Sequence, residues 1–337
     1  MIRSLTLATL AVLAGLALAG CGEKEEATGD ARPPAERLDL VLDYFPNADH
    51  AGIYAAQAAG DLRAAGVDLR IQTPSDPAAP LKLVAAGRAD VAISYEPELL
   101  LARDKGLEVT SIGALVQKPL TSIIAVKNAK IRSVADLRGK TVGTAGIPYQ
   151  AAYLETILRE ANVPQDSVRR VDVGFNLVPA MLSKKVDATL GAFWNYEGTE
   201  LQRRKREPTI IRLDEVGVPT YNELVLVASE ETVRDRGPLI RRLMLGLARG
   251  HARLREDPEA GIEPLLDANP DLERGLQEAV VRKTLPLFFP EEKGRGFGWQ
   301  DPRDWERYGR WMLDNGLLER EADPTALTNE FVPGSGI

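Results

Sequence analysis

The stretch Leu38–Gly60, LDLVLDYFPNADHAGIYAAQAAG, contains a strand candidate, a polar turn and a helix candidate in direct succession. Leucines at alternate positions of Leu38–Leu42 favour a short, largely buried strand. Tyr44–Asp49 then interrupts the pattern with turn residues, among them Pro46, which cannot donate to a strand ladder. The sequence therefore predicts that a strand ends at this loop.

A helix is expected from His50 to Ala59, where small and apolar residues predominate. Asn47 or Asp49 can cap its N-terminus through a side-chain oxygen, and Gly60 can end it in a left-handed conformation. In open α/β sheets, ligands gather at the carboxyl ends of strands and near helix N-termini. We therefore expect a ligand site here, because the loop and the first helical turn carry Asp43, Tyr44, Asn47, Asp49, His50 and Tyr54.

The rest of the chain alternates strand and helix candidates as far as residue 229. The further strands are expected at Val67–Gln72, Asp90–Tyr95, Val109–Leu115, Thr141–Thr144, Val168–Val173, Asp187–Phe193, Thr209–Leu213 and Leu224–Ser229, and Thr121–Lys127 is expected to be an extended crossing. Helices are expected at Ala78–Ala86, Glu98–Lys105, Gln150–Ala161 and Val178–Ser183, and again in a helical tail that includes Leu239–Leu254 and Asp301–Leu313. This alternation predicts an α/β protein with mostly parallel sheets, and about 300 residues suffice for two domains.

Two of the strand candidates resemble each other at both ends. GRAD at residues 87–90 precedes one strand, and KKVD at residues 184–187 leads into the other. The first strand ends in Tyr95 and Glu96, and the second ends in Phe193 and Trp194 with Glu197 just beyond. The repeat supports two similar lobes that carry the same kind of chemistry at their strand ends.

The first twenty residues have the pattern of a secretory leader. Arg3 supplies a positive start, and the apolar stretch Leu5–Ala19 is too short for a comfortable membrane span. Leu18–Cys21, LAGC, resembles the lipobox of bacterial lipoprotein signals; an ordinary cleaved signal is the alternative. We therefore expect residues 1–20 to be a signal peptide and Cys21, the only cysteine, to be lipidated.

Residues 21–37 are charged, poor in apolar side chains and contain Pro33 and Pro34, which predicts a flexible tether. The expected location is extracytoplasmic, with the protein anchored by lipid to a bacterial membrane. A formal net charge of −7 argues against nucleic acid as a partner. No second long apolar run follows the leader, so no transmembrane helix is expected in the mature chain.

Four motifs carry a resemblance to a known family: DYFPNADHAGIY at residues 43–54, SYEPE at 94–98, GAFWNYEG at 191–198 and PTYNEL at 219–224. With the lipobox and two α/β lobes, they resemble the solute-binding proteins of ABC importers. The nearest branch is similar to proteins that bind pyrimidine precursors of thiamine, such as formylaminopyrimidine or hydroxymethylpyrimidine. The overall layout is shared with importers of nitrate, sulfonates and riboflavin.

The resemblance implies a two-lobed periplasmic-binding-protein fold of type II, joined by two crossing segments. Lobe I is expected to comprise residues 38–118 and 226–337, and lobe II residues 119–225. It further implies a monomer that delivers its ligand to an ABC permease with its ATPase, and no cofactor.

The four motifs offer aromatic faces and hydrogen-bond acceptors but contain no Arg or Lys. An anionic ligand would be expected to recruit an Arg fork or a bare helix N-terminus. A planar heterocycle with amino donors, such as an aminopyrimidine, suits aromatic rings and carboxylates better. The expected ligand-binding residues are Asp43, Tyr44, Asn47, His50, Tyr54, Tyr95, Glu96, Trp194, Asn195, Glu197, Tyr221 and Asn222.

Within this set, Trp194 is expected to stack on one face of the ring, with Tyr44 or Tyr95 as another wall. Glu197 or Asp43 should accept from an amino group. His50 has only Asp49 beside it, so a metal site is not expected.

An enzyme is the rival class. The related fungal pyrimidine synthase uses a pyridoxal-phosphate lysine, a histidine and a cysteine cluster, but the lysine position here corresponds to Ser94 and no cysteine follows residue 21. A binding protein is therefore expected. Riboflavin, another heterocycle, or a nitrate- or sulfonate-type solute stays open as the ligand, and a lipid-anchored receptor with a flat protein-binding patch is a further alternative.

Overall fold

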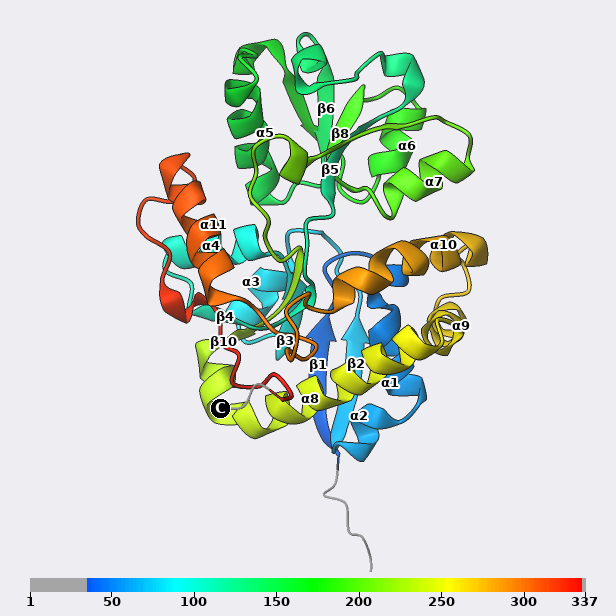
Figure 1. Ribbon diagram of the computed structural model, residues 1–337, viewed down its shortest axis with the longest axis vertical. Coiled ribbons are helices and arrows are strands. Elements are labelled where there is room, and N and C mark those ends of the chain that lie inside the picture. The colour runs from blue at the N-terminus through cyan, green and yellow to red at the C-terminus, as the bar shows by residue number, and fades with distance from the viewer. Residues whose placement is uncertain (1–34, 335–337) are drawn as a thin grey trace, which may run out of the picture. The chain divides into compact units, whose positions relative to one another are not determined.

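A computed structural model describes residues 35–334, so the leader, Cys21 and most of the expected tether lie outside the described residues. The described chain forms two five-stranded sheets, each flanked by helices, which confirms the prediction of two α/β lobes (Figure 1). The expected tether ran to Arg37, but Glu36 and Arg37 already pair with Val67 and Asp68. The first strand therefore begins inside the segment assigned to the tether.

The first sheet has one antiparallel strand in an otherwise parallel arrangement. Its order is β2 (Val67–Gln72), β1 (Glu36–Val41), β3 (Val91–Ser94), β10 (Leu224–Ser229) and β4 (Val109–Val116). β1 pairs in parallel with β2 and β3, whereas β10 runs antiparallel to both β3 and β4. β3 and β4 are buried along their whole length, as their continuous apolar runs require.

The second sheet repeats this plan. Its order is β7 (Arg169–Asp172), β6 (Thr141–Thr144), β8 (Ala188–Phe193), β5 (Thr121–Ala125) and β9 (Thr209–Arg212). β6 is parallel to β7 and β8, and β5 is antiparallel to β8 and β9. In both sheets the carboxyl ends of the parallel strands form one common edge, from which the loops of interest leave.

The chain passes between the sheets twice. It leaves β4 through residues 117–120 to reach β5, and it returns from β9 to β10 through residues 213–223. The sequence placed Leu224 and Val225 in lobe II, but both pair with β4 of the first sheet. The reason is that β10 is one apolar run, and its burial in the first sheet begins at its first residue.

The helices cover both sheets. They are α1 (Ala51–Ala58), α2 (Asp61–Ala64), α3 (Pro80–Ala85), α4 (Glu96–Asp104), α5 (Pro148–Glu160), α6 (Leu177–Leu182), α7 (Glu197–Arg203), α8 (Glu230–Glu256), α9 (Glu259–Ala268), α10 (Arg274–Thr284) and α11 (Pro302–Asp314). Short 3-10 turns lie between them, among them η1 (Ala48–His50). Within residues 35–334, no helix combines the length and the hydropathy that crossing a bilayer requires.

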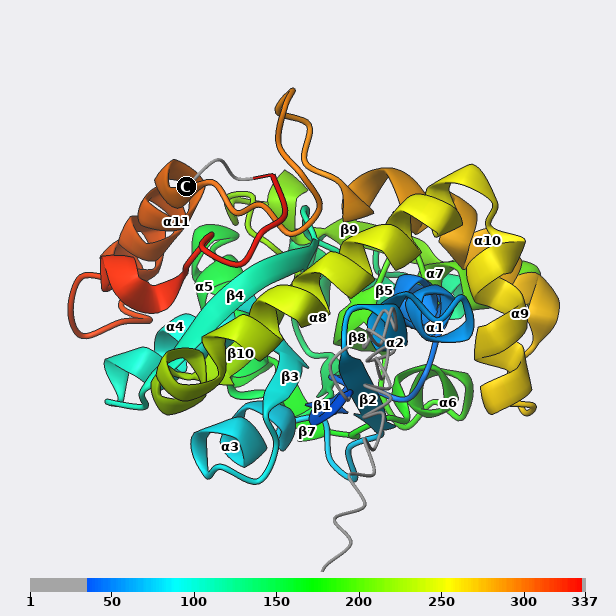
Figure 2. The same cartoon turned by 90° about the horizontal axis from the view of Figure 1, so that it is seen from below.

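The long helix α8 runs across one face of the first sheet (Figure 2) and packs against α1 and α2. It is kinked at Arg236, two residues before Pro238, which cannot donate to the preceding turn. At Gly52 of α1, a Cβ atom would collide with the imidazole of His251 on α8. The glycine of the first motif therefore permits the close approach of the two helices that holds the loop after β1.

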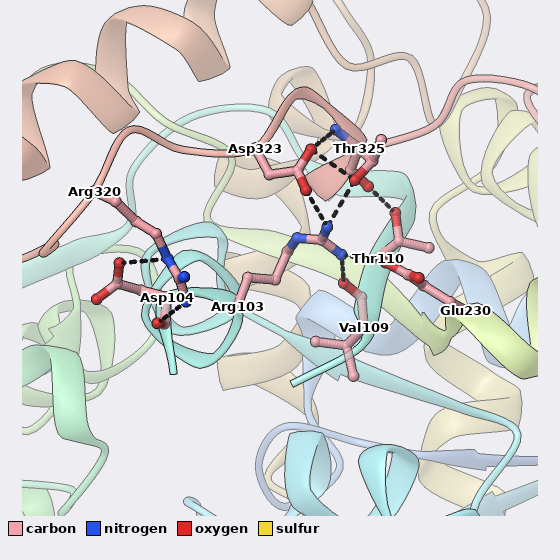
Figure 3. Close-up of polar contacts among 8 residues, drawn as sticks. All are labelled: Arg103, Asp104, Val109, Thr110, Glu230, Arg320, Asp323 and Thr325. Atoms are coloured by element: carbon pink, nitrogen blue, oxygen red, sulfur yellow. Dashed lines mark hydrogen bonds and ion pairs between the residues drawn. The ribbon is translucent and has the colours of Figure 1, made fainter. Parts of the chain in front are cut away.

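Arg103 on α4 fastens the C-terminal segment to the first lobe (Figure 3). Its guanidinium donates to Val109 O at 2.6 Å and Glu230 Oε1 at 2.7 Å, and to Asp323 Oδ2 at 2.9 Å and Thr325 Oγ1 at 2.7 Å. The side chain of Arg103 is only 10% exposed, although its acidic partners are about half exposed. One largely buried cation thus joins β4, the start of α8 and the final residues of the chain.

Replacing Arg103 by Met should lower the free energy of unfolding by about 2–3 kcal/mol, because four hydrogen bonds to one buried guanidinium are lost while its partners regain only part of their hydration. Urea denaturation measures the change. Arg320→Met is the matched control, since Arg320 pairs with Asp104 nearby but is 65% exposed. It should cost under about 1 kcal/mol, and equal losses in the two variants would contradict the assignment.

Candidate functional site

The loop after β1 is organised by Asp43, which is 2% exposed. Its two oxygens accept from His50 Nε2 and from Tyr95 Oη, each at 2.9 Å. The backbone N–H of Asn47 donates to His50 Nδ1 at 3.2 Å, so Nδ1 is an acceptor and the ring proton lies on Nε2. Asp43 is therefore held by two neutral donors and contributes an acceptor group at the edge of the first sheet.

Asn47 sets the start of the helical segment. Its side-chain oxygen accepts from the backbone N–H of Asp49 at 2.8 Å, which confirms the expected capping role. Gly60, expected to end the helix, has a φ of +74° just after the C-cap of α1. The quoted stretch thus folds locally as its residues predict.

A narrow cavity lies between the loops of the two sheets. The first lobe contributes the loop after β1, Tyr95 and Leu224, and the second lobe contributes the loops after β6 and β8. The lining residues are Asp43, Tyr44, Asn47, Asp49, His50, Tyr95, Ala145, Ile147, Gln150, Leu177, Gly191, Phe193, Tyr196, Glu197 and Leu224. These residues include three carboxyl groups and four aromatic rings other than histidine, but no Lys or Arg.

Aromatic side chains of the two lobes meet at one side of this cavity. Tyr44 Oη donates to the carbonyl of Phe175 at 3.0 Å, and the two rings are 4.7 Å apart in an edge-on arrangement. Phe45 packs against Tyr196 with a centroid separation of 5.8 Å. The structure is therefore a closed form, in which the lobes touch across the cavity mouth.

Glu197 is the first residue of α7 and is 6% exposed. Its Oε2 accepts from the backbone N–H of Phe193 at 2.8 Å. Burial raises the pKa of Glu197 to about 8, and the nearby carboxylates of Glu200 and Asp49 add to the rise. Burial likewise raises the pKa of Asp49 to about 6. The cavity thus holds two carboxyl groups whose charged forms are disfavoured by burial.

Six of the twelve expected site residues line this cavity: Asp43, Tyr44, Asn47, His50, Tyr95 and Glu197. The other six expected residues do not line the cavity; they are Tyr54, Glu96, Trp194, Asn195, Tyr221 and Asn222. Asn195 lies immediately behind it and donates to Asp49 at 2.7 Å. Tyr54 is buried in α1 and lies beside a separate shallow groove with Asn269.

The structure does not place Trp194 at the cavity, contrary to its expected role as the stacking wall. Its Nε1 donates to Pro119 O at 3.1 Å, and the guanidinium of Arg212 lies 4.9 Å from the ring centroid. Trp194 continues the pairing of β8 through Leu120 O. Phe193, the last residue of β8, lines the cavity, whereas Trp194 is the first residue of the following turn and does not.

Glu96, Tyr221 and Asn222 join the second crossing segment to the first lobe. Glu96 Oε2 accepts from the backbone N–H of Asn222 at 2.7 Å, and Trp305 donates to the Asn222 side chain at 2.9 Å. Tyr221 packs against Tyr308 with a centroid separation of 5.0 Å. In this form, the three residues hold the connection between the lobes in place and do not face the cavity.

Sequence reasoning missed Gln150 and Gly191, which face each other in the cavity wall. Gln150 Oε1 accepts from Ala145 N at 2.8 Å. Gly191 has a φ of +104°, and a Cβ there would collide with the Gln150 amide. A glycine inside the apolar strand DATLGAF is the signal that could have revealed this close approach. Tyr196 was also missed, although it lies inside a quoted motif.

Within residues 35–334, no three His, Cys, Asp or Glu side chains gather in a way that could hold a metal ion. The chemistry of the cavity is therefore described by its own side chains: acceptors on carboxyl groups, mixed donors and acceptors on amides, and aromatic walls. Such a set can stack a flat ring and pair with N–H groups on its edge.

Comparison with known proteins identifies the family. The model of the NMT1/THI5 like family matches residues 47–261. A formylaminopyrimidine-binding protein of Halalkalibacterium halodurans is 31% identical over 311 residues, which cover 92% of this chain and 93% of the relative. The chain belongs to the NMT1/THI5-like family.

Not every relative in this family is named as a binding protein. A protein of Legionella pneumophila named 4-amino-5-hydroxymethyl-2-methylpyrimidine phosphate synthase is 29% identical over 301 residues, covering 88% of this chain and 92% of the relative. Among solved structures, the alkanesulfonate-binding protein of Xanthomonas axonopodis pv. citri, bound to MOPS, has a TM-score of 0.68 at 15% identity and covers 88% of this chain and 99% of its own. This likeness shows that the family member described here has a periplasmic-binding-protein fold.

Glu197→Gln should reduce the dependence of stability on pH. In the folded protein the pKa of Glu197 is about 8, whereas in the unfolded chain it is near 4.5. The protonated carboxyl group therefore contributes its full stabilisation below pH 4.5, and this contribution is lost as the pH rises to about 8. Urea unfolding between pH 5 and 9 should therefore show a steeper fall in the wild type than in the variant, by a few kcal/mol. Parallel curves for the two proteins would contradict the buried, protonated state of Glu197.

Proposed function

We propose that this protein is the extracytoplasmic substrate-binding component of an ABC importer, and that it captures a thiamine-precursor aminopyrimidine of the formylaminopyrimidine or hydroxymethylpyrimidine type between its two lobes. The observation that carries the proposal is a cavity between the lobes that combines aromatic walls with buried carboxyl groups and lacks Lys and Arg. The formylaminopyrimidine-binding relative supports the same ligand class.

The carboxyl group of Glu197 suits an aminopyrimidine edge in particular. With a pKa of about 8, it retains its proton near neutral pH. A protonated carboxyl group can donate its O–H to a ring nitrogen and accept an N–H of the adjacent exocyclic amine. Each hydrogen bond to a charged or strongly polarised partner contributes about 1.5–3 kcal/mol, and stacking on an aromatic wall adds about 0.5–1.5 kcal/mol.

An enzymatic role is less well supported than binding. The cavity contains no lysine that could form a Schiff base, and Ser94, at the lysine position of the fungal synthase, donates to buried Glu98 at 2.7 Å. The only cysteine is Cys21, outside the described residues. A nitrate- or sulfonate-type ligand would place an anion near Asp43 and Asp49 in a cavity without Lys or Arg, so it is also disfavoured. Riboflavin or another heterocycle shares the stacking requirement and is the second candidate.

Ligand binding can be tested by thermal shift and calorimetry on the purified protein. 4-Amino-5-hydroxymethyl-2-methylpyrimidine at 100 times its dissociation constant should stabilise the fold by about 2.7 kcal/mol, whereas nitrate and MOPS should have no effect. Tight binding of riboflavin or of an anion, with no binding of any aminopyrimidine, would contradict the proposed ligand class.

The walls of the cavity can be tested with two neighbouring aromatic residues. Phe193→Ala should weaken binding of the aminopyrimidine about thirtyfold, because removal of a buried aromatic contact costs about 2 kcal/mol. Trp194→Ala is the matched control, since the next residue lies outside the cavity, and it should change the affinity by less than about threefold. If calorimetry showed that Trp194→Ala weakens binding more than Phe193→Ala, Trp194 and not Phe193 would be the residue that stacks on the ligand.

We further propose that residues 1–20 are removed and that Cys21 carries the lipid that anchors the protein. Support comes from the LAGC sequence at residues 18–21 and from the absence of any other cysteine in the chain. Mass spectrometry of membrane-extracted protein should find a lipidated Cys21 at the N-terminus. An unmodified Cys21, or a Cys21→Ser variant that stays membrane-bound, would contradict the anchor.

A further inference from the structure

Asp49 is the point at which three distant segments converge. It lies in η1, is 2% exposed and belongs to the first lobe. Its Oδ1 accepts from Asn195 Nδ2 at 2.7 Å and from Thr284 Oγ1 at 2.9 Å. Asn195 lies between β8 and α7 of the second lobe, and Thr284 is the last residue of α10. The Asn195 amide also donates to Thr284 Oγ1 at 2.7 Å, so Asp49 Oδ1 and Thr284 together hold the strand end of the second lobe.

The second oxygen of Asp49 is unsatisfied. Among residues 35–334, neither Asp49 Oδ2 nor Asn195 Oδ1 has a hydrogen-bond partner, and both atoms are buried. Asp49 also lines the cavity, and the ionisable groups near it are Asp43, His50, Tyr196 and Glu197. A buried acceptor without a donor costs about 1–3 kcal/mol, so the site favours a ligand that supplies an N–H.

We propose that Asp49 couples recognition to closure: its Oδ2 accepts an N–H from the exocyclic amine of the bound heterocycle while its Oδ1 holds Asn195 of the opposite lobe. The inference rests on the proposed function, because it concerns the same cavity. It makes Asp49 a specificity-determining residue that selects an amine over an oxo group at that position of the ring.

The coupling follows from the chemistry of one carboxyl group. An N–H donor at Oδ2 favours the ionised form, and an ionised acceptor forms stronger hydrogen bonds with Asn195 and Thr284 at Oδ1. The ligand thus stabilises the contact between the lobes, and by linkage the closed contact strengthens ligand binding to the same extent. An oxo group would instead direct its lone pairs at Oδ2, which disfavours that ligand.

Asp49→Asn tests the assignment because it keeps the shape but replaces one carboxylate oxygen by an N–H₂ group. We expect the affinity for 4-amino-5-hydroxymethyl-2-methylpyrimidine to fall at least tenfold, and the preference for this amine over its 4-oxo analogue to disappear. Thr284→Val is the matched control: it removes a donor to Oδ1 and an acceptor for Asn195, but it leaves the ligand-facing oxygen intact. It should weaken both ligands equally and leave their ratio unchanged.

Competition calorimetry on the full protein measures both ratios, and the unchanged far-ultraviolet circular dichroism of each variant shows that it is folded. A wild type that binds no aminopyrimidine would contradict the proposed function itself. A wild type that prefers the amine, together with an Asp49→Asn variant that keeps this preference, would overturn the coupling role and leave Asp49 as a contact between the lobes only.

Discussion

The arrangement of the two lobes depends on the carboxylate of Glu223, which joins both crossing segments. It accepts from Leu120 N at 2.6 Å, from Thr121 N at 2.8 Å, from Thr121 Oγ1 at 2.7 Å and from Tyr221 Oη at 3.0 Å. Burial raises the pKa of Glu223 to about 7, although these donors favour its charged form. Three of these donors belong to Leu120 and Thr121, on the segment that enters the second sheet, whereas Glu223 lies on the segment that leaves it. The carboxylate therefore ties the two connections to each other. On this side Tyr153 of α5 packs against Tyr221 and Trp311, so lobe II rests on the tail as well.

The two lobes also touch away from these connections. The contacts there include Tyr44 with Phe175, Phe45 with Tyr196, and Asp49 with Asn195, and α10 packs against α7. The cavity between the two sides concentrates carboxyl groups whose desolvation works against folding, as functional sites often do. On the proposed account, the amine of the ligand satisfies these groups and thereby favours the closed form, so that one set of side chains provides both specificity and closure.

Local pattern was sufficient to predict most of the fold. Alternating leucines, caps and glycines located β1, the capping residue Asn47 and the end of α1, and the restart of strands after Thr121 indicated a second lobe. The 3-10 turn η1 before α1 was not predicted. The loop after β1 was also predicted as part of the site. Local pattern could not show which residue at the end of a strand lines the cavity, so Trp194 was expected at the position that Phe193 occupies. It also could not give contacts between residues far apart in sequence, such as Asp49 with Thr284, because these depend on how α10 returns over the lobe.

In the proposed function, the cavity between the lobes binds an aminopyrimidine through buried carboxyl groups. A crystal structure of the protein grown with 4-amino-5-hydroxymethyl-2-methylpyrimidine would show whether it does. We expect density for one ring against Phe193 and Tyr95, with its amine within hydrogen-bonding distance of Glu197 and Asp49. Density for the ligand at another site, or a cavity that stays without ligand at saturating concentration, would contradict it.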